Sequence, residues 1–157
     1  MTRSSPARGD MRVKSLRTAI GAGAVIGMLA VCSAGVVARQ ARSVWDGVYT
    51  AEQALRGAPL YQQSCAECHG PEMSGGEMSP GLVGGEFVWN WNGLSVGDLF
   101  ERLRVSMPQG EPGSVSRQEK ADILAFLLEA NDFPVGDTEL ADRTAMLRGI
   151  TFLVQEP

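Results

Sequence analysis

Cys65-Ala66-Glu67-Cys68-His69 dominates the interpretation of this 157-residue sequence. Thiols at positions i and i+3 of a helical turn lie on one side, so both reach the same edge of a flat ligand. The imidazole of the next residue, His69, then points under that ligand. The C-x-x-C-H pattern is typical of covalent haem attachment, and it predicts thioether links at Cys65 and Cys68 and a proximal iron ligand at His69.

Three other uses of these cysteines fit the sequence less well. A zinc site needs four ligands, and no second C-x-x-C pair completes one. A thioredoxin-like redox pair follows a strand, and no strand pattern precedes Cys65. A disulfide between Cys65 and Cys68 closes a loop too small to constrain the unfolded chain appreciably. Covalent haem is therefore the favoured prediction.

The opposite side of the iron needs a different kind of ligand, because His69 is the single histidine of the chain. A methionine thioether is the usual alternative and raises the reduction potential. Met107 is favoured, because it precedes Pro108 and lies far enough along the chain to reach the other haem face. The alternatives left open are Met73, Met78 and Met146, and each methionine could instead fill the core.

Three helices are predicted, at about 51–64, 95–107 and 116–131. Each begins at a Ser or Thr with a polar partner three residues later, in the pairs Thr50 and Gln53, Ser95 and Asp98, Ser116 and Glu119. Glycine- and proline-rich loops occupy residues 70–85 and 108–114. Three short helices bury too little apolar surface to offset the entropy of such loops. The predicted class is therefore all-α, a small fold whose three core helices and long loops wrap around one haem.

The N-terminal 38 residues are predicted to be an export signal. Residues 11–18 are basic and residues 19–38 are apolar and uncharged, with small residues before Arg39 that suit cleavage. The same run is long enough to remain as a membrane anchor, whereas a lipoprotein site at Cys32 is disfavoured by the preceding valine. We then expect an extended lead-in (39–50), a haem domain (51–135) and a C-terminal tail packed on it (136–157), located in the periplasm.

The exported part of the chain is strongly acidic. Residues 39–157 contain nine basic and 17 acidic side chains, a net charge of −8. Such a surface repels phosphate, so nucleic acid is excluded as a partner. It either favours a basic patch on a partner protein or simply aids solubility.

Taken together, these patterns resemble class I cytochromes c, of the single-haem bacterial type found beside periplasmic dehydrogenases. The matching stretches are residues 43–50, Arg56–Tyr61, Cys65–Gly70, Gly75–Leu82, Met107–Pro108, Ala121–Phe126 and Asn131–Pro134. The resemblance implies one haem c, thioether links at Cys65 and Cys68, His69 as the proximal ligand and Met107 as the distal ligand.

The resemblance also implies contacts around the haem. The first and last core helices should cross, with Gly57 and Tyr61 meeting the region of Phe126. The Pro80 carbonyl should support His69.

Aromatic side chains are further candidates for haem contacts. Trp89 and Trp91 could bind haem propionates through their indole N–H groups or pack on the porphyrin edge, and Tyr61 is a third candidate. Arg102 and Arg104 could pair with the propionates, but a solvated helix face is the favoured prediction for both.

With both axial positions of the iron filled, no site remains for a substrate, so the sequence predicts an electron carrier rather than an enzyme. The resemblance implies redox partner proteins, with a periplasmic dehydrogenase as donor and an oxidase or another cytochrome as acceptor. The membrane is a partner only if the N-terminal segment is retained. Two alternatives stay open: a haem subunit of a dehydrogenase complex, and a gas-binding sensor whose Met107 dissociates.

Overall fold

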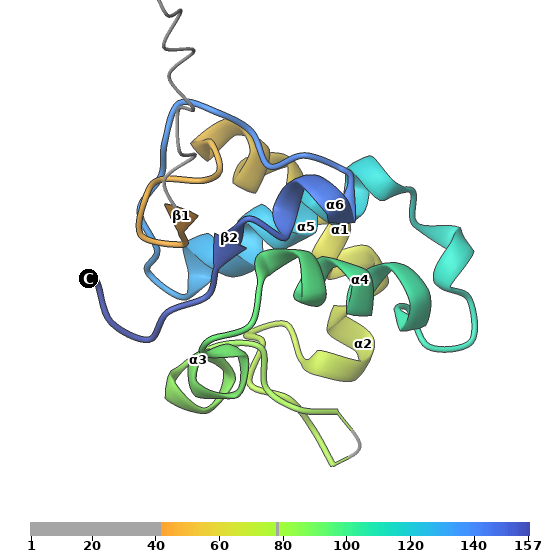
Figure 1. Cartoon of the computed structure of the whole chain (residues 1–157). Helices are drawn as coiled ribbons and strands as arrows, with labels where there is room; N and C mark the ends of the chain where they lie inside the picture. Colours follow the sequence, from red (N-terminus) through yellow and green to blue (C-terminus); the bar gives the residue numbers. More distant parts are fainter. Residues whose placement is uncertain (1–41, 78) are drawn as a thin grey trace, which may run out of the picture. The chain divides into compact units, whose positions relative to one another are not determined.

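Helices α1 (Ala51–Ser64) and α5 (Arg117–Ala130) cross at the centre of the structure, a computed structural model that describes residues 42–77 and 79–157 (Figure 1). The crossing is close because Gly57 has no side chain: a Cβ atom there would overlap the Asp122 carbonyl oxygen. Arg56 lies beside it and donates from Nε and Nη2 to the two Asp122 carboxylate oxygens, each at 3.1 Å. The expected crossing of the first and last core helices is therefore present.

The remaining elements are short and surround this pair. They are β1 (Arg42–Ser43), α2 (Ala66–His69), α3 (Gly85–Trp91), α4 (Val96–Ser106), the 3₁₀ turn η1 (Pro112–Ser114), α6 (Thr144–Leu147) and β2 (Ile150–Thr151). The three predicted helices correspond to α1, α4 and α5, and the predicted all-α class is confirmed. Helix α4 stops before Met107, as the following proline predicts. Helix α3 was not predicted from the sequence.

The starts of the three predicted helices can be compared with the capping pairs expected from the sequence. Ser95 and Ser116 both form reciprocal capping boxes with the acidic residue three positions later. Thr50 caps α1 by accepting from the Gln53 N–H, at 3.2 Å. The Gln53 side chain does not return to Thr50, because its buried amide instead exchanges two hydrogen bonds with the Leu140 backbone, at 3.1 and 2.7 Å. Of the capping pair expected at Thr50 and Gln53, only the hydrogen bond to the Thr50 side chain is thus formed.

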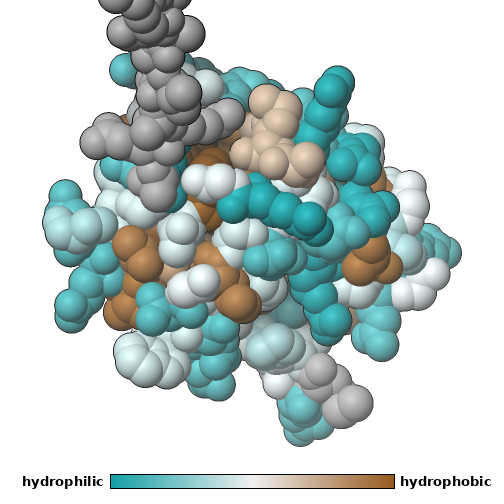
Figure 2. Space-filling view, in the orientation of Figure 1, coloured by the Kyte–Doolittle hydropathy of each residue, from teal (hydrophilic) through white to brown (hydrophobic). Residues whose placement is uncertain are grey.

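The C-terminal segment lies against the helices. Its apolar residues Leu140, Leu147, Ile150 and Phe152 are buried in one cluster with the aromatic side chains of Tyr49, Phe87, Phe100 and Phe133. Strand β2 pairs with β1 in parallel, Arg42 opposite Ile150 and Ser43 opposite Thr151. Figure 2 shows that hydrophilic residues cover most of one face, interrupted by separate apolar patches.

Some sequence predictions fall outside this description. The predicted export segment (1–38) and Met78 lie outside the described residues. Among residues 42–77 and 79–157, none of the helices has both the length and the apolar character that a bilayer crossing requires.

Candidate functional site

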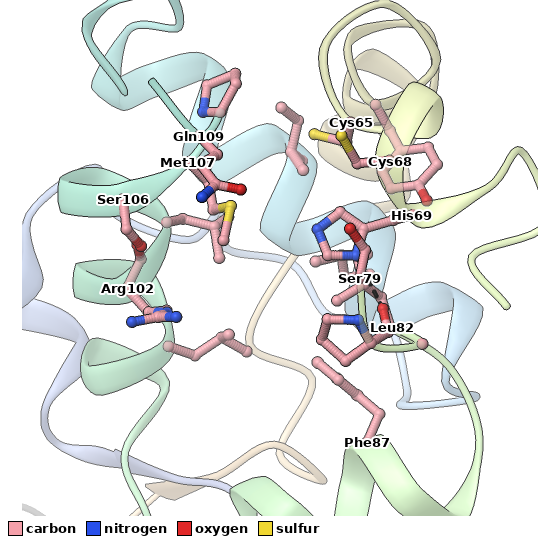
Figure 3. A pocket seen from close by; sticks show the side chains of 18 of the residues that line it. Cys65, Cys68, His69, Ser79, Leu82, Phe87, Arg102, Ser106, Met107 and Gln109 are labelled. Atoms are coloured by element: carbon pink, nitrogen blue, oxygen red, sulfur yellow. Dashed lines mark hydrogen bonds between the residues drawn. The ribbon is translucent and has the colours of Figure 1, made fainter. Parts of the chain in front are cut away.

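The segment Cys65–His69 forms one helical turn at the end of α1. The Cys65 N–H closes α1 by donating to the Tyr61 carbonyl, at 2.9 Å, and the His69 N–H donates back to the Cys65 carbonyl, at 3.0 Å. Gly70 then leaves the turn with a φ of 78°, a left-handed conformation that favours glycine. Both thiols are free, and Figure 3 shows their sulfur atoms together at one edge of a cavity.

His69 has one ring nitrogen engaged and the other available. Its Nδ1 lies 2.9 Å from the Pro80 carbonyl oxygen. A carbonyl oxygen only accepts, so Nδ1 carries the proton and Nε2 keeps its lone pair for a metal. The imidazole is 8% exposed, and Figure 3 shows it pointing into the cavity. Pro80 therefore occupies the supporting position that the family resemblance implies.

Tyr61 stabilises the end of the same turn. Its hydroxyl donates to the Gly70 carbonyl, at 2.7 Å, and burial raises the pKa of this phenol to about 12. Its ring lies 5.8 Å from that of Phe126 between centroids, at the α1–α5 crossing. Tyr61 thus links the cysteine turn to the helix pair, and it also lines the cavity.

Met107 enters the cavity from the opposite side. It caps the C-terminus of α4 in an extended conformation, with its N–H bonded to the Leu103 carbonyl at 3.2 Å. Figure 3 shows its sulfur atom facing His69 across the cavity. Of the other described candidates, Met73 is buried in a core cluster and Met146 is 55% exposed on α6. Met107 is the candidate that the structure brings to His69.

The cavity between His69 and Met107 has a volume of about 450 Å³, within the roughly 300–1,000 Å³ of cofactor pockets. Apolar side chains form much of its wall, and polar ones lie among them. The lining residues are Tyr61, Ser64, Cys65, Cys68, His69, Ser79, Pro80, Gly81, Leu82, Phe87, Asn90, Trp91, Leu99, Arg102, Leu103, Ser106, Met107, Pro108, Gln109, Ile123 and Leu127. These come from α1, α2, α3, α4, α5 and the connecting loops.

The chemistry of this cavity suits haem c. Two thiols lie at one edge, and an imidazole and a thioether face each other across the space, as two axial iron ligands must. Apolar walls suit the porphyrin faces. Arg102, which lines the cavity, would supply a cation for propionates. The residues present therefore fit the group that the sequence predicts.

The two tryptophans have different environments. Trp91 lines the cavity and is half-buried, whereas Trp89 is 68% exposed and is not part of the cavity wall. Residues two positions apart on a helix point about 200° apart, so one indole faces inward and the other outward. Arg102, expected from sequence on a solvated face, instead lines the cavity. Phe87 and Asn90 also line it and were missed, because α3 was not predicted.

Burial also affects the thiol of Cys65. It raises the pKa of Cys65 to about 11, and the nearby Lys120 ammonium opposes that rise. Burial therefore favours the neutral thiol over the thiolate at Cys65. A neutral thiol suits the apolar wall.

The comparison with protein families agrees with this site. The family described as cytochrome c oxidase, cbb3-type, subunit III matches residues 52–127, which contain the cysteine turn and Met107. A solved structure, the sulfane dehydrogenase SoxCD from Paracoccus pantotrophus, is similar at 20% identity, with a TM-score of 0.44. That alignment covers 69% of this chain and 61% of the matched chain. No curated protein sequence matches the chain.

The fold, the cavity and the matching family agree. An all-α fold encloses the cavity, a C-x-x-C-H turn forms one wall, and a cytochrome c family spans both. The chain is a class I c-type cytochrome, with a domain of the kind that performs haem electron transfer.

Proposed function

We propose that this chain is a periplasmic electron carrier with one haem c, covalently attached through Cys65 and Cys68 and ligated by His69 and Met107. The observation that supports it best is the placement of His69 and Met107 on opposite sides of one cavity (Figure 3). When bound, haem supplies an iron atom that gains and loses one electron. If His69 and Met107 both hold that iron, no position would remain on it for a substrate, which favours a carrier over an enzyme.

The protein residues hold the group and set its surroundings. The Pro80 carbonyl keeps the His69 Nε2 directed at the iron position, and α4 delivers Met107 from the other side. Apolar residues such as Leu99 and Leu127 exclude water from the interior. Cys68 is exposed, so the edge attached there is expected to be the one that exchanges electrons with a partner.

An optical spectrum tests this proposal directly. We would record the dithionite-reduced protein before and after adding carbon monoxide. A low-spin c-type spectrum that carbon monoxide leaves unchanged is expected for a closed His69 and Met107 pair. A shift on adding carbon monoxide would contradict the carrier proposal and favour the gas-binding alternative.

Covalent attachment and export are tested by mass spectrometry of the mature protein. We expect the mass to include one haem after denaturation, with an N-terminus at Arg39. The Cys65→Ala, Cys68→Ala double variant is expected to lose the covalent haem. Release of the wild-type haem by acid and organic solvent would contradict the attachment, and recovery of the chain in the cytoplasmic fraction would contradict the location.

The proposed partners are a periplasmic dehydrogenase as donor and an oxidase or another cytochrome as acceptor. The acidic surface of residues 39–157 favours partners with a basic patch. Electron-transfer rates with basic and acidic test cytochromes test this: the rate with the basic one should be faster and should fall with ionic strength. A faster rate with the acidic protein would contradict the proposed complementarity.

A further inference from the structure

Lys120, on α5, is a buried lysine. Its side chain is 3% exposed, although lysine is almost never fully buried without a partner. Its Nζ donates to two backbone carbonyls, that of Arg104 at 3.3 Å and that of Pro112 at 2.5 Å. None of the ion pairs among the described residues involves it. A buried cation held by carbonyls alone calls for a functional explanation.

The two carbonyls lie on either side of Met107. Arg104 is in the last turn of α4, where carbonyls have no partner within the helix and the helix dipole attracts a cation. Pro112 begins η1, beyond the loop that follows Met107. The single Nζ therefore joins both ends of the segment 105–111, with Met107 inside it.

The other side of α5 is fixed to the proximal half of the site. Two residues after Lys120, Asp122 meets Arg56 and Gly57 at the α1–α5 crossing, and α1 leads directly into Cys65. The Lys120 ammonium is also near enough to Cys65 for the two groups to interact through their charges. Lys120 therefore lies between the distal loop and the attachment edge.

We propose that Lys120 positions Met107 for the iron and supplies a fixed positive charge that raises the reduction potential of the site. This inference rests on the proposed function. A positive charge in a region of low dielectric disfavours the ferric state, which carries one more positive charge than the ferrous state. The same two hydrogen bonds restrict the loop and so hold the thioether near its ligating position.

Three substitutions separate the charge from the hydrogen bonds. Lys120→Arg keeps the charge, Lys120→Gln keeps N–H donors without it, and Lys120→Met removes both. Arg143→Gln is the control, since it deletes a cation whose side chain is 75% exposed. For each holoprotein we would measure the midpoint potential and the ferric charge-transfer band that reports iron–thioether coordination.

We expect Lys120→Gln to shift the ferrous–ferric equilibrium about tenfold toward ferric, a fall of about 59 mV for a one-electron couple, while keeping the band. Lys120→Met should lower the potential and also weaken the band. Lys120→Arg should keep the reduction potential close to that of the wild type, and Arg143→Gln should change it little.

Two results would overturn the inference, and they are distinguishable. If the wild-type protein has the band but the Gln and Met variants match Arg143→Gln in potential and band, Lys120 has neither role. If the wild-type protein itself lacks the band, Met107 is not the ligand, and the proposed function fails together with the inference. Should Lys120→Met not fold, the potential of Lys120→Gln still decides the role of the charge.

Discussion

His69 and Met107 reach the cavity by different local means. The imidazole is oriented by a hydrogen bond to a loop carbonyl eleven residues away, at Pro80. The thioether is delivered by the end of a helix, where Met107 serves as the C-cap of α4. One side chain thus depends on a loop and the other on a helix terminus, so each can be altered without removing the other.

Met107→Ala is expected to open the distal side of the iron. Thioether ligation raises the reduction potential, so its loss should lower it, by on the order of 0.1 V within the ~0.8 V that axial ligands span. The reduced variant should also bind carbon monoxide. Redox titration and a carbon monoxide difference spectrum measure both effects. Met146→Ala, on exposed α6, is the control, and an unchanged potential in Met107→Ala would mean that another residue is the ligand.

Much of the candidate site could be predicted from residue types and spacing. The five-residue turn at Cys65–His69 specifies its own chemistry, and Met107 follows from the single histidine and the adjacent proline. The role of Lys120 could not be predicted, and a position near the propionates was only the less favoured prediction for Arg102, because a lone basic residue on a helix is usually solvated. The burial of Lys120 and the place of Arg102 in the cavity wall depend on how α4 and α5 pack, which the local sequence does not specify.

At the scale of elements, the sequence indicated the start of a helix where a side chain caps it and gave no indication where none does. The capping boxes at Ser95 and Ser116 could be predicted because they use side chains at a fixed spacing. Helix α3 begins at Gly84 and Gly85 with no side-chain cap, so its start has no local signal. Without α3, the sequence could not distinguish the inward Trp91 from the outward Trp89.

Gly57→Ala tests the α1–α5 crossing. The added methyl group would overlap the Asp122 carbonyl oxygen and push the helices apart. We expect the free energy of unfolding to fall by about 1–3 kcal/mol, as for other overpacked sites. Urea unfolding of the holoprotein measures this. Gly149→Ala is the matched control, because its Cβ would meet open space, and equal stability of the two variants would show that the crossing accommodates a methyl group.

Glu101 makes the link between α4 and α6 sensitive to acid. Hydrogen bonds from Arg104 and from Thr144 lower the pKa of this carboxyl from 4.5 to about 2. The unfolded chain therefore binds a proton at higher pH than the folded chain does. The contribution of ionised Glu101 to the free energy of unfolding is complete above about pH 4.5 and disappears toward pH 2.

Glu101→Gln should therefore be less stable than wild type at pH 6, and the difference should shrink as the pH falls toward 2. Urea unfolding at a series of pH values measures it. Glu86→Gln removes the same charge from an exposed position on α3 and serves as the control. A difference that stays constant from pH 6 to 2 would contradict the assignment.

At the scale of the whole molecule, residues 140–152 complete a core that three helices leave open. Phe152 lies 5.1 Å from Phe133 and 6.1 Å from Phe87 between ring centroids, both nearly perpendicular. Its backbone exchanges 2.8 Å hydrogen bonds with Gly93 and Leu94, in the loop after α3. The sequence shows these apolar residues but not the surface they cover, because that contact joins segments about 60 residues apart.

Phe152→Ala should be strongly destabilising. The side chain is fully buried, and truncation of a buried phenylalanine costs about 3–5 kcal/mol. Urea unfolding measures the loss, and Val135→Ala, at a position 53% exposed, should change stability by less than about 0.5 kcal/mol. Equal effects of the two substitutions would mean that the C-terminal segment does not contribute to the core.

The pairing of β1 with β2 has a consequence for protein engineering. Since Arg42 lies opposite Ile150, the first described residue is adjacent to the last strand of the fold, an arrangement that suits circular permutation and insertion into a host protein. A linker from the segment after β2 to Arg42, with new termini at the exposed Gly84 and Gly85, would place Met107 before His69 along the polypeptide. Both side chains would keep their positions in space, so the domain could be transplanted as a redox module whose ligand order is reversed.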